Sequence, residues 1–305
     1  MAGGTAGRHD PDMSTTATDA IILTVLNGMA GSDPAAAMDR LQAWGIDWLD
    51  LKDAWFGKRV EHWTTDESAQ VGALAAARGL AVLSLSSSLG KDAIEGGEAA
   101  WRASLAPLAG LVANARILRP RCIRLVAPSL ARRAEEPEAL AAIDRQSWLM
   151  PALREAVDAL AATGATVVFE NESPGTVFGT PDEVLGFFAR LDRPAARMIW
   201  DVGNWWHFGC SRLPTVADAL ALRHLVGVLH LKGGRSERPD GPLRWAAPLS
   251  RTSWDVAGVV RTVLAGGACG VICLNPPHGE RSPDLPCDYG DDLRYIRTTF
   301  PEILK

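Results

Sequence analysis

The chain has 305 residues, of which 47% are hydrophobic and 22% charged, a length and balance that predict a globular protein with a large buried core. Lysine and arginine number 31 against 36 aspartate and glutamate. The resulting net charge of −5 argues against a nucleic-acid partner, because binding to a phosphate backbone needs a basic surface. The chain contains no uninterrupted apolar stretch of about 18 residues, so we expect no membrane-spanning helix.

Residues 1–19 are polar and rich in Gly, Ala, Asp, Ser and Thr. They lack the apolar segment of a secretory signal, so we expect a disordered N-terminal extension, with Met13 as an alternative start. The five scattered cysteines form no Cys-x-x-Cys pair, and their odd number is typical of reduced thiols. These features together predict a cytoplasmic protein.

Eight short apolar segments recur along the rest of the chain, and several are continuously apolar, as strands buried on both faces of a parallel sheet are. The expected strands are 21–26, 47–51, 80–85, 122–126, 165–170, 197–201, 226–231 and 270–274. Segments with helical character follow them, several opening on Thr, Asp or Pro start signals. The expected helices are 34–44, 65–78, 97–118, 144–163, 180–190, 215–223, 255–265 and 289–299.

This alternation of strand and helix, repeated eight times, predicts an α/β fold and specifically a single (β/α)8 TIM barrel over residues 20–305. A doubly wound open sheet is the alternative. It is disfavoured because no Gly-x-Gly-x-x-Gly fingerprint follows the first strand and no Walker-type loop occurs.

Polar residues stand where three consecutive strands are expected to end: Glu170 on the fifth, Asp201 on the sixth and His230 on the seventh. The carboxyl ends of barrel strands converge on one axis and carry the catalytic groups of this fold. Two carboxylates and one imidazole suit a divalent cation. The sequence therefore predicts a metal site at this end of the barrel.

Four segments in order resemble successive signatures of the xylose isomerase-like TIM-barrel superfamily. They are Val-Val-Phe-Glu170-Asn-Glu172, Trp-Asp201-Val-Gly-Asn204, Val-Leu-His230-Leu-Lys232 and Leu-Asn275-Pro-Pro-His278. The resemblance implies an isomerase or epimerase that acts on a small sugar-like substrate. It also implies one divalent metal, with Mn²⁺ expected first and Mg²⁺, Co²⁺ or Zn²⁺ as alternatives, held by Glu, Asp, His and Glu on strands five to eight.

The first three implied ligands map onto Glu170, Asp201 and His230, but Asn275 stands where the family has its second Glu. Asn275 is the expected fourth ligand, a weaker one, through its carbonyl oxygen. An amide accepts no proton at neutral pH, so epimerisation by two opposed bases is in doubt. The expected catalytic residues are Glu170, Lys232 and His278, with Glu172 a further candidate for the missing base. Lys232, His278 and Glu172 each have a structural or surface role as their alternative.

Tryptophan is unusually frequent, with 11 residues against 2 tyrosines, and aromatic faces stack on sugar rings. The expected substrate-binding residues are Lys52, Trp55, Asn204, Trp205 and His207. For the tryptophans, packing between helices and barrel is the alternative. For Lys52, which suits a phosphate or carboxylate, the alternative is a solvated surface charge.

The leading hypothesis is a metal-dependent isomerase or epimerase that moves a proton next to a metal-polarised carbonyl of a sugar or polyol. Two alternatives stay open: a one-base lyase or hydratase acting on a keto-sugar, glycoside or natural-product intermediate, and a catalytically degenerate barrel that only binds. The resemblance also makes a homo-oligomer an expectation. The endonuclease branch is disfavoured, because its three-metal site needs histidines that are missing after the third and fourth strands.

Overall fold

The computed structural model describes residues 21–135, 138–172, 174–207, 213–238, 243–277, 279–281, 284 and 289–302. Residues 1–19, expected to form an extension, and His278, an expected catalytic residue, lie outside this described part. Within the described residues, no helix combines the length and the apolar character that crossing a membrane requires.

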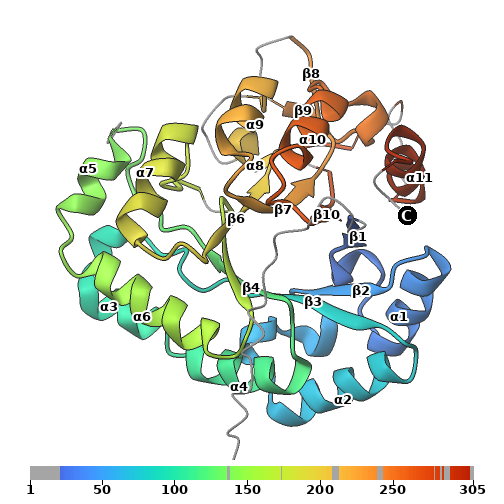
Figure 1. Ribbon diagram of the computed structural model, residues 1–305, viewed down its shortest axis with the longest axis horizontal. Helices are drawn as coiled ribbons and strands as arrows, with labels where there is room; N and C mark the ends of the chain where they lie inside the picture. The colour runs from blue at the N-terminus through green and yellow to red at the C-terminus, as the bar shows by residue number, and fades with distance from the viewer. Residues whose placement is uncertain are drawn as a thin grey trace, which may run out of the picture.

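Eight parallel strands form one nearly closed barrel (Figure 1). They are β1 (Ile22–Val25), β2 (Trp48–Leu51), β3 (Ala81–Ser86), β4 (Cys122–Val126), β5 (Thr166–Glu170), β6 (Arg197–Asp201), β7 (Val226–Leu231) and β10 (Val271–Leu274). The strands pair in the order β1-β10-β7-β6-β5-β4-β3-β2, and a single bridge between Leu26 and Asp50 connects the two ends. The predicted (β/α)8 barrel is therefore confirmed, and each expected strand overlaps an observed one.

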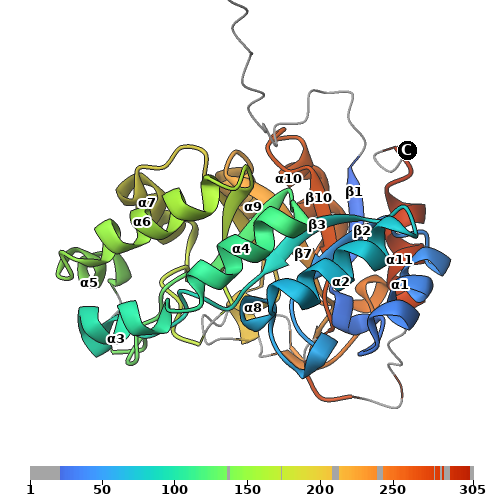
Figure 2. The same cartoon turned by 90° about the horizontal axis from the view of Figure 1, so that it is seen from below.

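Helices lie on the outside of these strands, as the two perpendicular views in Figures 1 and 2 show. They are α1 (Pro34–Ala43), α2 (Thr65–Ala76), α3 (Gly97–Ser104), α4 (Leu108–Leu118), α5 (Ala139–Asp144), α6 (Leu149–Ala161), α7 (Pro181–Leu191), α9 (Val216–Leu222), α10 (Val256–Leu264) and α11 (Tyr289–Thr299). The short α8 (Asn204–His207) instead follows directly after the end of β6. The last helix packs next to the first: Arg297 on α11 donates to the carbonyl of Trp44, 2.6 Å away, directly after α1.

The start signals in the sequence act as expected. The Asp33 side chain accepts from the Ala36 amide at 2.8 Å and caps α1, whose first residue is Pro34. Thr64 and Glu67 form a reciprocal capping box at the start of α2. Such caps satisfy amides that have no partner inside the helix, which makes helix starts readable from the sequence.

One expected helix is interrupted. Residues 97–118 form α3 and α4, because Pro107 has no amide hydrogen to continue a helix and restricts the residue before it. The helix expected at 144–163 is observed as the shorter α6, and the separate helix α5 precedes it. After β7 the chain adds a short antiparallel pair, β8 (Arg235–Ser236) and β9 (Leu243–Trp245).

The strand register gathers the polar residues on the inner face of the barrel. Asp201 pairs with His230, and His230 pairs with Cys273. Glu170 pairs with Ile199, two positions before Asp201. Because alternate residues of a strand share a face and paired residues of neighbouring strands point the same way, all of these side chains face the barrel interior.

Candidate active site

A cavity of about 380 Å³ opens where the barrel strands end. It is lined by Leu26, Gly28, Met29, Lys52, Asp53, Ala54, Glu170, Glu172, Asp201, Asn204, Lys232, Asn275 and Pro276. Most of these residues end a barrel strand or follow one, the position that carries catalytic groups in this fold. Polar lining in a pocket of this size suits a small hydroxylated molecule.

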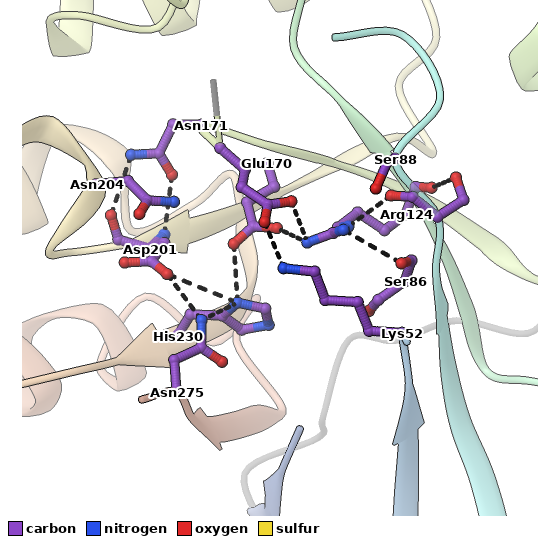
Figure 3. A network of polar contacts seen from close by, with 12 residues as sticks. Lys52, Ser86, Ser88, Arg124, Glu170, Asn171, Asp201, Asn204, His230 and Asn275 are labelled. Atoms are coloured by element: carbon purple, nitrogen blue, oxygen red, sulfur yellow. Dashed lines mark hydrogen bonds and ion pairs between the residues drawn. The ribbon is translucent and has the colours of Figure 1, made fainter. Parts of the chain in front are cut away.

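Three expected metal ligands converge at this cavity (Figure 3). His230 Nδ1 lies 2.9 Å from Glu170 Oε1 and 4.0 Å from Asp201 Oδ2, and all three side chains are buried. Two ligands held about 2.1 Å from one ion are separated by about 3.0–4.2 Å, depending on the angle between them. The two distances from His230 Nδ1 are close to or within this range, and the three donor atoms all lie within 4.8 Å of one another, so the group could hold a divalent cation.

Asn275 follows β10 and stands beside these three residues. Its Nδ2 donates to Asp201 Oδ2 at 2.8 Å and lies 3.1 Å from His230 Nδ1. A half-turn of the amide would present the carbonyl oxygen there instead, because the two ends of the group have the same shape. The position of Asn275 thus suits a neutral fourth ligand, the role expected from the sequence.

A buried arginine stands behind the carboxylates. Arg124 on β4 forms an ion pair with Glu170 and a second one, of 2.7 Å, with Glu172. Burial by itself would raise the pKa of Glu170, but the Arg124 guanidinium and then the His230 ring outweigh burial and hold that pKa well below its usual range. Glu170 is therefore ionised at neutral pH, as a metal ligand must be.

Lys232 follows β7 and reaches back to the same carboxylates. Its Nζ lies 2.7 Å from Asp201 Oδ2 and donates to Asn204 Oδ1 at 3.0 Å. Gly203 makes room for this side chain, because a Cβ at that position would lie 2.5 Å from Lys232 Cγ. Lys232 and Asn204, expected as a catalytic and a substrate-binding residue, both line the cavity.

Lys52 and Glu172 form an ion pair that also lines the cavity. Glu172 also pairs with Arg124, which in turn pairs with Glu170. These four side chains therefore form one chain of alternating charges that links the end of β2 to the end of β5. Both side chains are about one-fifth exposed, at 19% for Lys52 and 23% for Glu172, so both are accessible from the cavity.

The two tryptophans expected to bind substrate lie in the packing around the cavity and are not among its lining residues. Trp55 is fully buried, donates from Nε1 to the Gly31 carbonyl and stacks on Trp63. Trp205 is equally buried, and its Nε1 donates to the Phe178 carbonyl. The surroundings of both residues are those of the alternative role, packing between helices and barrel. The His207 side chain, like all of His278, lies outside what the structure describes.

Two residues of this interior were missed by the sequence reasoning, Arg124 and Asp50. Arg124 is a charged residue inside an otherwise apolar strand, Cys-Ile-Arg-Leu-Val, and that interruption is the signal by which it could have been found. Asp50 is the last residue but one of β2, close to the strand end at which Glu170 was singled out on β5. Both are buried, with exposures of 0% and 1%.

Comparison with known proteins agrees with this geometry. The family described as xylose isomerase-like TIM barrel matches residues 38–299. No curated protein matches the chain in sequence. Among solved structures, a xylose isomerase-like TIM barrel protein from Mycobacterium smegmatis in complex with magnesium is similar, with a TM-score of 0.68, 18% identity, and 95% of this chain and 100% of that chain covered.

Two other similar structures have named activities. The 3-keto-D-glucoside 4-epimerase of E. coli has a TM-score of 0.67 at 14% identity, with 91% of this chain and 99% of that chain covered. The probable 3-DHS dehydratase of Bacillus anthracis has a TM-score of 0.57 at 15% identity, with 87% and 93% covered. At these identities the likeness shows the fold. The family match, which spans most of the chain, shows that this protein belongs to the xylose isomerase-like TIM-barrel family.

Proposed function

We propose that the protein is a divalent-metal-dependent isomerase or epimerase that acts on a sugar or sugar-like polyol. The observation that carries the proposal is the convergence of Glu170, Asp201 and His230 at the ends of the barrel strands, where Glu170 and Asp201 line the cavity. The fold and family are shared with sugar epimerases and with a structure that contains magnesium, which supports the same reading.

Glu170, Asp201 and His230 would hold the ion, with the Asn275 carbonyl as a neutral fourth ligand. Mn²⁺ is the expected ion, because carboxylate and imidazole donors suit it, and Mg²⁺, Co²⁺ and Zn²⁺ are alternatives. When bound, the ion supplies a positive charge that polarises a substrate carbonyl and acidifies the adjacent C–H bond.

The chain's own side chains would orient the substrate and move its proton. The ammonium groups of Lys52 and Lys232 reach the cavity and can donate hydrogen bonds to substrate hydroxyls or carbonyl oxygens. A Glu170 carboxylate oxygen is the proton acceptor on one side of the substrate carbon. Because Asn275 accepts no proton, the opposite side has no equivalent base. Glu170 would therefore return the proton to the adjacent carbon on the same face, which, with a proton moved between the two substrate oxygens, is aldose–ketose isomerisation. Epimerisation would need a second proton donor on the opposite face.

Metal retention tests the site directly. The wild-type protein, loaded with Mn²⁺ and then desalted, is expected to retain about one equivalent per chain by elemental analysis. Glu170→Gln and Asp201→Asn should lose that ion. Glu172→Gln is the matched control, because it removes a neighbouring cavity carboxylate that is not a proposed ligand. If the Glu170 and Asp201 variants retained the ion as the control does, the assignment would be wrong.

A one-base lyase or hydratase is the second candidate, and Asn275 in place of the family's second Glu is the observation that favours it. Incubating the loaded enzyme in D2O with a panel of ketoses, aldoses and keto-glycosides separates the two reactions. An isomerase incorporates deuterium and conserves the molecular mass otherwise, whereas a lyase releases water or an alcohol. Metal binding without any turnover on the panel would favour a barrel that only binds.

A further inference from the structure

The two ring nitrogens of His230 face different surroundings. Nδ1 faces Glu170, Asp201 and Asn275, and the dashed contacts of the ring in Figure 3 all leave this edge. Nε2 lies on the far edge of the ring, is buried, and has no hydrogen-bond partner among the described residues. Burying a ring nitrogen without a hydrogen-bond partner costs folding free energy. The group that Nε2 faces is therefore a candidate for a partner that forms when the site is occupied.

That group is the carboxylate of Asp50, which comes from β2 while His230 comes from β7. Asp50 Oδ2 lies 3.8 Å from His230 Nε2, beyond hydrogen-bond distance but with both side chains almost completely buried. Ser86 donates to Asp50 Oδ1 at 2.5 Å, and the Cys273 thiol lies 3.5 Å from Oδ2. These two contacts hold the carboxylate in the barrel interior, facing the ring edge that points away from the metal ligands.

Metal-binding histidines usually donate their other ring N–H to a carboxylate, a carbonyl or water, which fixes the tautomer and increases the basicity of the ligating nitrogen. If an ion occupies Nδ1, the ring proton must be on Nε2, and the acceptor that the interior offers on that edge is Asp50. A shift of about 1 Å in either side chain brings the pair to hydrogen-bond distance.

We propose that Asp50 is a positioning residue for the metal centre: it accepts the Nε2–H of His230 and so commits Nδ1 to the ion. This inference rests on the proposed function, because it takes the Glu170–Asp201–His230 site as a metal site. It adds a carboxylate that touches neither the ion nor the substrate.

The proposal also explains how this chain retains an ion with fewer anionic ligands than its family pattern. Asn275 removes one negative charge from the ligands themselves. Asp50 places a negative charge directly behind the imidazole, where it strengthens the His230 ligand. The opposing interpretation is that Asp50 belongs only to a structural polar cluster with Ser86 and Cys273.

Mn²⁺ affinity separates the two interpretations. Free Mn²⁺ is measured by electron paramagnetic resonance during titration of the wild type, Asp50→Asn and Ser86→Ala. The Asp50 variant keeps the side-chain shape but loses the charge and is expected to bind about 10–100-fold more weakly. Ser86→Ala disturbs the same cluster and leaves the carboxylate in place, so its affinity should stay within about threefold of the wild type. Equal losses in both variants would support the structural cluster and overturn the proposal.

A second measurement needs no variant of Asp50 and therefore does not depend on how well Asp50→Asn folds. In ¹⁵N-histidine-labelled protein loaded with Zn²⁺, the His230 ring, identified by its absence in His230→Gln, is expected to carry its proton on Nε2. A proton on Nδ1 would overturn the inference. Failure of the wild type to bind any ion would overturn the proposed metal site together with it, whereas unchanged affinity in Asp50→Asn overturns this inference alone.

Discussion

Replacing Arg124 with methionine is expected to destabilise the fold strongly at neutral pH. The guanidinium is completely buried and forms ion pairs with Glu170 and Glu172. It also donates to the backbone carbonyls of Ser87 at 2.9 Å and Ser86 at 3.1 Å. Methionine fills much of the same volume but leaves the Glu170 carboxylate buried, with His230 as its remaining close partner.

Breaking a buried pair by removing one partner typically costs about 3–5 kcal/mol, because a charge stays in a low-dielectric interior without compensation. For a chain of this length, roughly 2 °C of melting temperature corresponds to each kcal/mol, so the expected decrease is about 6–10 °C. Arg193→Met is the matched control: it breaks a 2.7 Å pair with Asp158 at the surface, where solvent screens the charges, and should leave the melting temperature nearly unchanged.

The loss of stability in Arg124→Met is expected to depend on pH, and the pKa of Glu170 determines the direction of that dependence. In the wild type the depressed pKa of Glu170 adds stability that is present above the unfolded-state pKa and is lost only as pH falls through the lower folded-state pKa. Without Arg124, the largest influence that lowers this pKa is lost, and we expect burial to outweigh the His230 ring and to raise the pKa of Glu170 above its unfolded-state value. The variant is then expected to lose stability relative to the wild type as pH rises from about 5 to about 7.5.

Thermal unfolding followed by circular dichroism in EDTA, at about pH 5 and about pH 7.5, measures both effects. The chelator removes any contribution of a bound ion to stability. A decrease at neutral pH no larger than that of Arg193→Met, or a difference from the wild type that does not grow with pH, would refute the reasoning.

Three further predictions follow from individual contacts. Lys232→Met removes an ammonium 2.7 Å from Asp201 Oδ2, so Mn²⁺ binding should tighten roughly tenfold; weaker binding in the paramagnetic resonance titration would show that the ammonium does not oppose the ion. Asn275→Glu adds an anionic ligand beside Asp201 and His230 and should likewise tighten binding about tenfold, whereas an unchanged affinity would place residue 275 outside the coordination sphere. Gly203→Ala forces a Cβ to within 2.5 Å of Lys232 Cγ, so it should cost about 1–3 kcal/mol, and an unchanged melting temperature would mean that Lys232 moves aside freely.

The barrel itself could be predicted from the sequence, because the signals that specify it are local. A strand buried on both faces has a continuous apolar sequence, and capping residues such as Asp33 and the Thr64–Glu67 box mark the start of a helix. The strand-end positions of Glu170, Asp201 and His230 could be read in the same way, since eight alternating units determine on which end of the barrel they gather.

The surroundings of those residues depended on the tertiary structure. Arg124 and Asp50 find their partners on other strands, Glu170 on β5 and His230 on β7, and the sequence contains no local trace of either pairing. The same holds for Trp55, because an aromatic residue in a loop reads identically whether its ring faces a cavity or, as here, stacks on Trp63.

Burial patterns and caps act over a few residues and are therefore written in the sequence. The state of a charge depends on every group that faces it across the barrel. The register and closure of the strands bring β2, β4, β5 and β7 around one interior. Only this arrangement decides that Glu170 is held ionised and that Nδ1 of His230 is the ring nitrogen that faces Glu170.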